Sequence, residues 1–73
     1  MSAIIIGDRE FRIGATYEPK NLASQRRKTL LVYRPFATWP FRGPSVQYRN
    51  KNTSTEWSSV GAWLKWAGEE VQP

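Results

Sequence analysis

The first residues of the chain show the hydrophobic and polar pattern of a β-hairpin. Ala3–Ile6 is apolar and rich in β-branched side chains, and the residues after it alternate between polar and apolar. This alternation places Phe11 and Ile13 toward a core and Arg12 toward solvent. The intervening Gly7-Asp8 has the glycine-first pattern of a two-residue turn. We therefore predict two antiparallel strands here.

The middle of the chain predicts a loop, a central strand and a second, stiffer loop. Residues 14–22 contain glycine, proline and asparagine, so we expect a loop in which Thr16-Tyr17 is extended. Thr29–Arg34 is a nearly continuous apolar run, which predicts a central strand with both faces partly covered. Segment 35–44 has three prolines and cannot form a regular helix or an inner strand.

The last third of the chain predicts a strand pair followed by a helix. Ser45–Arg49 alternates as a strand, residues 50–52 form a turn, and Thr53–Trp57 returns as the partner strand. Ser58 or Ser59 can then cap a helix, whose apolar positions have helical spacing and whose expected C-terminal stop is Gly68. These apolar positions are Val60, Trp63, Leu64, Ala67 and Val71. We expect Trp63 in the core and residues 69–73 as a flexible tail.

These elements predict a mainly β fold that forms one domain over residues 1–73. About five short strands would make a small curled sheet or barrel with one C-terminal α-helix, and in strand count and order this layout resembles the SH3-like small barrels. A chain of 73 residues buries only roughly 60% of the surface that its unfolded form exposes. Its 4 Trp, 3 Tyr and 3 Phe residues are therefore the expected source of stability, because large rings bury the most area.

Composition argues against an enzyme. The chain has no Cys and no His, which excludes disulfides, zinc-finger sites, thiol nucleophiles and the usual neutral-pH base. The carboxylates form no spaced pair, and the glycines form no phosphate-binding loop. We expect no cofactor and no metal. The longest apolar run is far below the roughly 20 residues that cross a bilayer, so we expect a cytoplasmic protein without membrane contact.

Positive charge is concentrated in the first two thirds of the chain. Ten basic and two acidic residues lie between Arg9 and Lys51, a net +8, whereas residues 52–73 have a net charge of −2. The sequence pI near 10.1 is typical of nucleic-acid-binding proteins. Arginine outnumbers lysine, and its planar fork suits phosphates, bases and carboxylates alike. The charge therefore favours recognition without selecting the partner.

Arg26-Arg27-Lys28 is the densest basic run and has two interpretations. Three cations on a loop can neutralise backbone phosphates and release counterions. They can equally form a solvated loop that protects the edge of the following strand.

The proline-rich loop is the second candidate site. Phe36, Trp39 and Phe41 lie between Arg34 and Arg42, a combination used both by single-stranded nucleic-acid grooves and by protein hot spots. Alternatively, the rings close one end of a small core. We expect this second role for at least two of the three rings and expect Trp39 to stay partly exposed.

A third feature is a polar stripe on two predicted strands. If the strands that contain Arg34 and Arg49 are neighbours, these arginines and Gln47 form a stripe continuous with Arg42, or an ordinary solvent-facing surface.

We therefore predict a non-enzymatic binding module that contacts nucleic acid, DNA or RNA. The candidate binding residues are Arg26, Arg27, Lys28, Arg34, Trp39, Arg42 and Arg49. The alternative is a protein-interaction module, a small inhibitor or adaptor of bacteriophage or mobile-element type, that binds an acidic protein surface. A third interpretation is a structural subunit whose exposed aromatics form a homo-oligomer interface, and the sequence does not give an oligomeric state.

Overall fold

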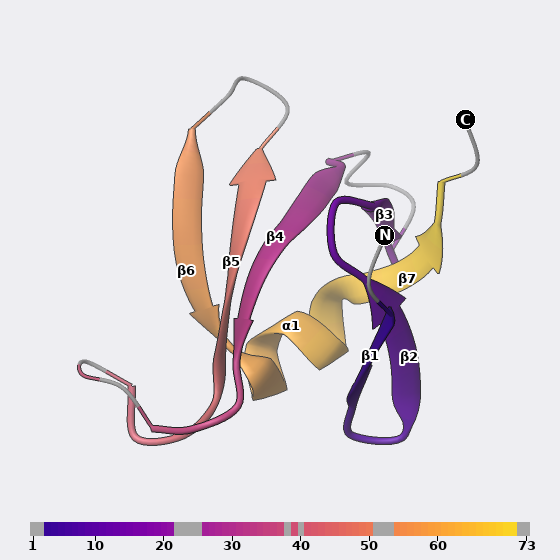
Figure 1. Ribbon diagram of the computed structural model, residues 1–73. Helices are drawn as coiled ribbons and strands as arrows, with labels where there is room; N and C mark the ends of the chain where they lie inside the picture. Colours follow the sequence, from indigo (N-terminus) through magenta and orange to yellow (C-terminus); the bar gives the residue numbers. More distant parts are fainter. Residues whose placement is uncertain (1–2, 22–25, 38, 40, 51–53, 72–73) are drawn as a thin grey trace.

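The computed structural model describes residues 3–21, 26–37, 39, 41–50 and 54–71. They form two antiparallel sheets and one short helix (Figure 1). The elements are β1 Ala3–Ile6, β2 Arg9–Arg12, β3 Thr16–Pro19, β4 Lys28–Arg34, β5 Ser45–Asn50, β6 Thr55–Ser59, α1 Val60–Trp66 and β7 Ala67–Glu70. None of the described helices is both long and apolar enough to cross a membrane.

The N-terminal hairpin is confirmed. Strands β1 and β2 pair antiparallel, with Ile6 opposite Arg9, and Gly7 takes a φ of 66° in the turn. This left-handed conformation costs a glycine little and explains the glycine at this position. Phe11 is fully buried, but Arg12 is half-buried rather than directed simply to solvent.

The second sheet has five strands in the order β6-β5-β4-β3-β7. Its centre is β4, as predicted, and the expected extended segment at Thr16-Tyr17 is the start of β3. Because β6 and β7 stand at opposite edges and do not pair with each other, the sheet is not closed, and of the two predicted forms the small curled sheet is confirmed rather than the barrel. Helix α1 runs from one edge to the other (Figure 1), so a helix stands where a barrel would need strand pairing.

The predicted helix is real but shorter than expected. It begins as predicted after Ser59, whose side chain accepts a hydrogen bond of 3.2 Å from the Ala62 backbone N–H. It ends at Trp66, because the chain then becomes extended and pairs with β3. The close approach of β3 requires a glycine at position 68, where a Cβ atom would lie 2.9 Å from the Glu18 carbonyl oxygen.

The pairing of β7 also corrects the predicted tail. Glu69 and Glu70 belong to β7, and the Val71 N–H donates a 2.8 Å hydrogen bond to the Thr16 carbonyl. Residues 72–73 of that predicted tail, and residues 51–52 of the predicted turn, lie outside the described residues. Apolar residues at 67 and 71 fit a helix by spacing alone, but tertiary pairing selects a strand.

Trp63 is the centre of the core, as predicted, and is only 1% exposed. Its ring centroid lies 5.3–6.0 Å from those of Phe11, Tyr17, Tyr48 and Trp66. These rings come from β2, β3, β5 and α1, so one side chain of the helix joins both sheets.

Two arginines of β2 hold the hairpin against β7. The Arg9 guanidinium donates to the carbonyl oxygens of Ala67 and Gly68, at 2.7 and 2.8 Å. Arg12 forms a bidentate ion pair with Glu70, and this hydrogen bonding lowers the pKa of the Glu70 carboxyl. Two of the basic residues of the sequence, Arg9 and Arg12, thus make contacts within the fold.

Candidate functional site

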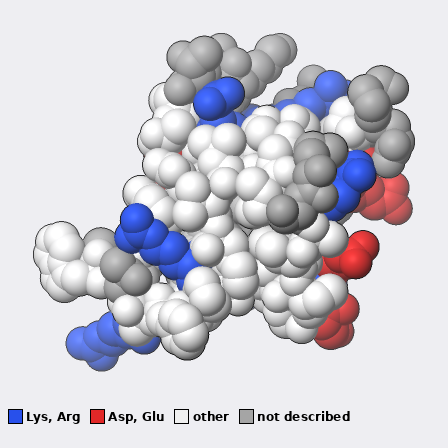
Figure 2. Space-filling model, viewed as in Figure 1, with Lys and Arg blue, Asp and Glu red and all other residues white. Residues whose placement is uncertain are grey.

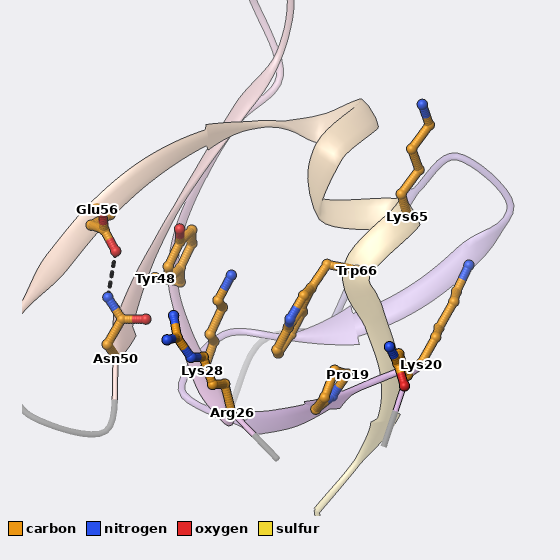
Figure 3. Close-up of a pocket in the computed structure, with 10 residues that line it drawn as sticks. Pro19, Lys20, Arg26, Lys28, Tyr48, Asn50, Glu56, Lys65 and Trp66 are labelled. Carbon is orange, nitrogen blue, oxygen red and sulfur yellow. Dashed lines mark hydrogen bonds between the residues drawn. The ribbon is translucent and has the colours of Figure 1, made fainter. Parts of the chain in front are cut away.

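A pocket of about 770 Å³ opens where β4 begins, β5 ends and α1 ends (Figure 3). Strand pairing creates it, since Lys28 lies opposite Asn50 at this end of the sheet and the end of α1 lies against β3. The lining residues combine cations, amides, aromatic rings and one carboxylate. They are Pro19, Lys20, Asn21, Arg26, Lys28, Tyr48, Asn50, Glu56, Lys65 and Trp66.

The ammonium group of Lys28 lies between two aromatic rings of this pocket. Its nitrogen is 4.3 Å from the Tyr48 ring centroid and 4.4 Å from that of Trp66, both within the range of cation–π attraction. Figure 3 shows the Lys28 side chain extending between these two rings. Burial is the main cause of a lowered Lys28 pKa; the Glu56 carboxylate opposes the shift and Arg26 adds to it.

The single acidic group in the lining is held at one wall. The Asn50 side-chain amide donates a 2.5 Å hydrogen bond to Glu56 (Figure 3) and a 3.3 Å hydrogen bond to Ser54. Glu56 lies opposite Tyr48 in the β5–β6 pair, and burial, followed by this carboxylate, raises the pKa of the Tyr48 phenol.

Positive charge in the lining is therefore in excess. The four cations are Lys20, Arg26, Lys28 and Lys65, against the one carboxylate. Within the described part of the chain, no carboxylate oxygen lies within 4.0 Å of any of these cationic groups. The lining residues thus carry a net formal charge of about +3, with Arg26 and Lys28 on one side of Trp66 and Lys20 and Lys65 on the other (Figure 3).

The structure brings together only two of the predicted binding residues at this pocket. Arg26 and Lys28 line it, whereas the exposed Arg27 between them does not. The solvated-loop interpretation of the basic run fails for Lys28, which is the first residue of β4 and is half-buried. Long-range pairing, which the local sequence does not reveal, supplies the rest of the lining.

Arg34, Trp39 and Arg42 lie at the opposite end of β4 and β5, where the proline-rich loop extends beyond the sheet (Figure 1). Trp39 is 90% exposed, as expected. Phe36 is 79% exposed, so the prediction that at least two of the three rings close the core is wrong. The physical reason is that α1 begins at this end, where the Val60 N–H donates to the Pro44 carbonyl at 3.1 Å.

The predicted polar stripe lies on the outer face of the sheet. Strands β4 and β5 are neighbours, as predicted, and Arg34 and Arg49 are exposed. Arg49 lies between two pocket residues of β5, so alternation directs it to the other face. The Arg34 guanidinium lies 4.4 Å from the Trp57 ring centroid. The predicted residues therefore divide between two faces.

Sequence reasoning missed eight of the ten lining residues, among them Lys20, Tyr48, Lys65 and Trp66. The two lysines are isolated in the sequence, and neither stands in a motif. Trp66 gave the one usable signal, because it lies off the apolar stripe of the helix that contains Trp63.

The surface charge has the same division. Figure 2 shows basic side chains in separate groups at the upper end of the molecule and around the loop at the lower left, with uncharged surface between them. Acidic side chains gather at the right edge, where β7 and the β1–β2 hairpin lie. A single continuous basic stripe is not present on this face.

Among the described residues, no group of three or more acidic side chains is arranged to hold a metal ion. Comparison with protein-family models, with curated proteins and with solved structures finds no match. The pocket is therefore interpreted from its own chemistry.

Proposed function

We propose that this protein is a non-enzymatic nucleic-acid-binding module, which holds backbone phosphates at the Lys28 pocket. The observation that carries the proposal is the Lys28 ammonium group, positioned between Tyr48 and Trp66 in a lining with excess positive charge. Arg26 beside it is a further phosphate ligand, and Lys20 and Lys65 add positive charge from the other side of Trp66 (Figure 3).

Preorganisation makes Lys28 a better ligand than an ordinary surface lysine. A free lysine side chain loses up to about 2 kcal/mol of rotamer entropy when it is fixed, whereas the two rings already restrict Lys28. Partial burial also strengthens its attraction to an anion, because less water screens the pair. The lowered pKa of Lys28 has the same origin, since burial and a neighbouring cation disfavour its charge. A bound phosphate would offset both effects, because its negative charge stabilises the Lys28 cation.

A polyanion suits this chain better than a single small anion does. Beyond the pocket, Arg27, Arg34, Arg42 and Arg49 are all exposed, and the formal net charge is +5. Exposed Trp39 and half-exposed Trp57 offer ring faces for unpaired bases. We therefore expect single strands to bind more tightly than duplexes, with the pocket as the strongest phosphate site.

The test compares two variants that each remove one positive charge. Lys28→Met keeps an unbranched chain between the rings, and Arg49→Met removes a charge from the outer face. Binding to a labelled single-stranded oligonucleotide is measured by fluorescence anisotropy across a salt titration. We expect Lys28→Met to weaken binding about tenfold or more, because it removes a charged hydrogen bond worth about 1.5 kcal/mol. Arg49→Met should weaken binding clearly less.

Three outcomes would contradict the proposal. Equal effects of the two variants would indicate long-range charge alone. If inorganic phosphate competed with the labelled oligonucleotide as well as an unlabelled oligonucleotide of the same total phosphate charge does, the pocket would be a small-anion site. Absence of binding to DNA and RNA at low salt would exclude the function, because phosphate contacts are strongest there. The melting temperature of each variant controls for folding.

A protein partner is the second candidate, and one observation favours it. Phe36 and Trp39 are highly exposed in the proline-rich loop beside Arg34 and Arg42, and Trp and Arg are the residue types most enriched in protein hot spots. This role fits a small inhibitor or adaptor of bacteriophage or mobile-element type, acting in the cytoplasm on an acidic surface. Trp39→Ala would abolish capture of such a partner from nuclease-treated lysate and leave the Lys28 pocket intact.

A further inference from the structure

Strand β6 has a free edge whose backbone groups can be assigned. The Asn50 N–H donates to the Ser54 carbonyl at 2.8 Å, and the Val60 N–H donates to the Pro44 carbonyl at 3.1 Å. The β5–β6 register is unbroken between these two bonds, and backbone hydrogen bonds of an antiparallel pair recur at every second residue. Residues 56 and 58 therefore turn their backbone groups toward β5.

It follows that Thr55, Trp57 and Ser59 turn their backbone N–H and C=O groups away from the sheet. Strand β6 is the last strand in the sheet order, so no strand of the described chain pairs with these groups. The Ser59 carbonyl belongs to the helix cap, but Thr55 and Trp57 offer complete donor and acceptor pairs. A row of this kind is a template for a further strand.

The other edge of the sheet is protected, which makes the contrast informative. Strand β7 contains Gly68 and two glutamates, and its register against β3 is irregular. Its carbonyls at Ala67 and Gly68 are already bonded by Arg9. Strand β6 has no proline, no lysine and no register shift, and Glu56 is its one charged residue, so it has fewer of the usual protections against strand addition than β7.

The sequence of β6 is complementary to a second copy of itself in one register. Glu56 is the one charged residue of β6. A second copy of β6, antiparallel about a two-fold axis at Trp57, places Glu56 opposite Ser58 of the partner subunit and Trp57 opposite Trp57 of the partner subunit. A two-fold axis at Glu56 would instead oppose two carboxylates, which is destabilising. Only the first register forms an aromatic pair without a like-charge pair.

We propose that two copies of this chain associate through antiparallel pairing of their β6 strands, with the two-fold axis at Trp57. The five-stranded sheets then form one sheet across the dimer, and each Trp57 stays on the outer face beside its own Arg34. The interface is isologous, so it closes at two chains and needs no further partner. This inference is independent of nucleic-acid binding, since none of its hydrogen bonds uses the pocket.

The register is tested with two substitutions of opposite charge at one position. Ser58→Lys places a cation opposite Glu56 of the partner subunit, and Ser58→Glu places a carboxylate there. Sedimentation equilibrium on nuclease-treated protein, over a roughly hundredfold range of concentration, gives the dimer dissociation constant of each. We expect Ser58→Lys to tighten the dimer and Ser58→Glu to weaken it, each about fivefold, because two symmetry-related pairs form.

A third variant tests the edge itself. Because the Trp57 N–H points away from β5, Trp57→Pro removes the donor of the interface without removing a β5–β6 bond, and it should yield a folded monomer. In the unmodified chain, hydrogen exchange at the Thr55 and Trp57 amides should slow as concentration rises, whereas exchange at Glu56 and Ser58 should not. A monomer at every concentration would overturn the proposal, as would shifts of the same sign for both Ser58 variants.

Discussion

Replacement of Trp63 by alanine is the most informative change to the core. Trp63 is 1% exposed and its ring contacts four other aromatic rings from both sheets. Removing a buried Trp costs about 3–5 kcal/mol, and each lost aromatic pair adds about 0.5–1.5 kcal/mol where neighbouring rings do not close the space. A 73-residue domain has about 4–11 kcal/mol in total. Trp63→Ala should therefore be largely unfolded at room temperature.

Trp63→Phe separates volume from polarity. The Trp63 indole N–H is buried, and no described residue accepts a hydrogen bond from it. An unsatisfied buried donor costs about 1–3 kcal/mol, so phenylalanine removes a penalty together with the lost volume. We expect Trp63→Phe to fold and to lose clearly less stability than Trp63→Ala.

Urea denaturation followed by circular dichroism gives both free energies of unfolding. Trp39→Ala serves as the matched control, because this ring is 90% exposed and its loss should change stability by less than about 0.5 kcal/mol. If Trp39→Ala unfolded the domain while Trp63→Ala were tolerated, the assignment of the core to the helix would be wrong.

Two further predictions concern the β7 strand. The pKa of Glu70 is lowered, mainly by hydrogen bonding from Arg12, so this carboxylate stabilises the fold fully above its usual value near 4.5, and the contribution is lost as pH falls through the lowered value. Glu70→Gln should thus reduce the melting temperature at neutral pH and converge with the unmodified chain in acid; a constant difference at all pH values would refute this. Gly68→Ala should cost about 1–3 kcal/mol, because the added Cβ would meet backbone atoms of β3. Gly61→Ala, which meets nothing within 4 Å and lies in the helix, should instead stabilise by about 1 kcal/mol, and equal melting shifts for both would contradict the close approach.

The structural features that were predicted best are those whose sequence signal is local. The Gly7-Asp8 turn, the apolar run of β4 and the cap at Ser59 each depend on a few adjacent residues, and the structure confirms each. The helix end failed for the opposite reason, since Ala67 and Val71 satisfy helical spacing and only the pairing with β3 makes this segment extended. No local pattern could supply that pairing.

The candidate site shows the same limit. The basic run identified Arg26 and Lys28, but the rings that position Lys28 come from β5 and from the end of α1. Aromatic residues in the proline-rich loop were expected inside because a small chain needs volume, yet the helix already closes that end. The interpretation of charge failed similarly for Arg9 and Arg12, which are bonded to β7.

The bonds from Arg9 to β7 also constrain how the chain reaches this fold. They join residues separated by 58 and 59 positions, so almost the entire described chain lies within the loop that they close. Closing a long loop costs entropy before its contacts compensate, and folds rich in such contacts form slowly. The β1–β2 hairpin consequently has to wait for β7 before it can dock. On a ribosome, docking would therefore be one of the last steps, completed only after Gly68 has left the exit tunnel.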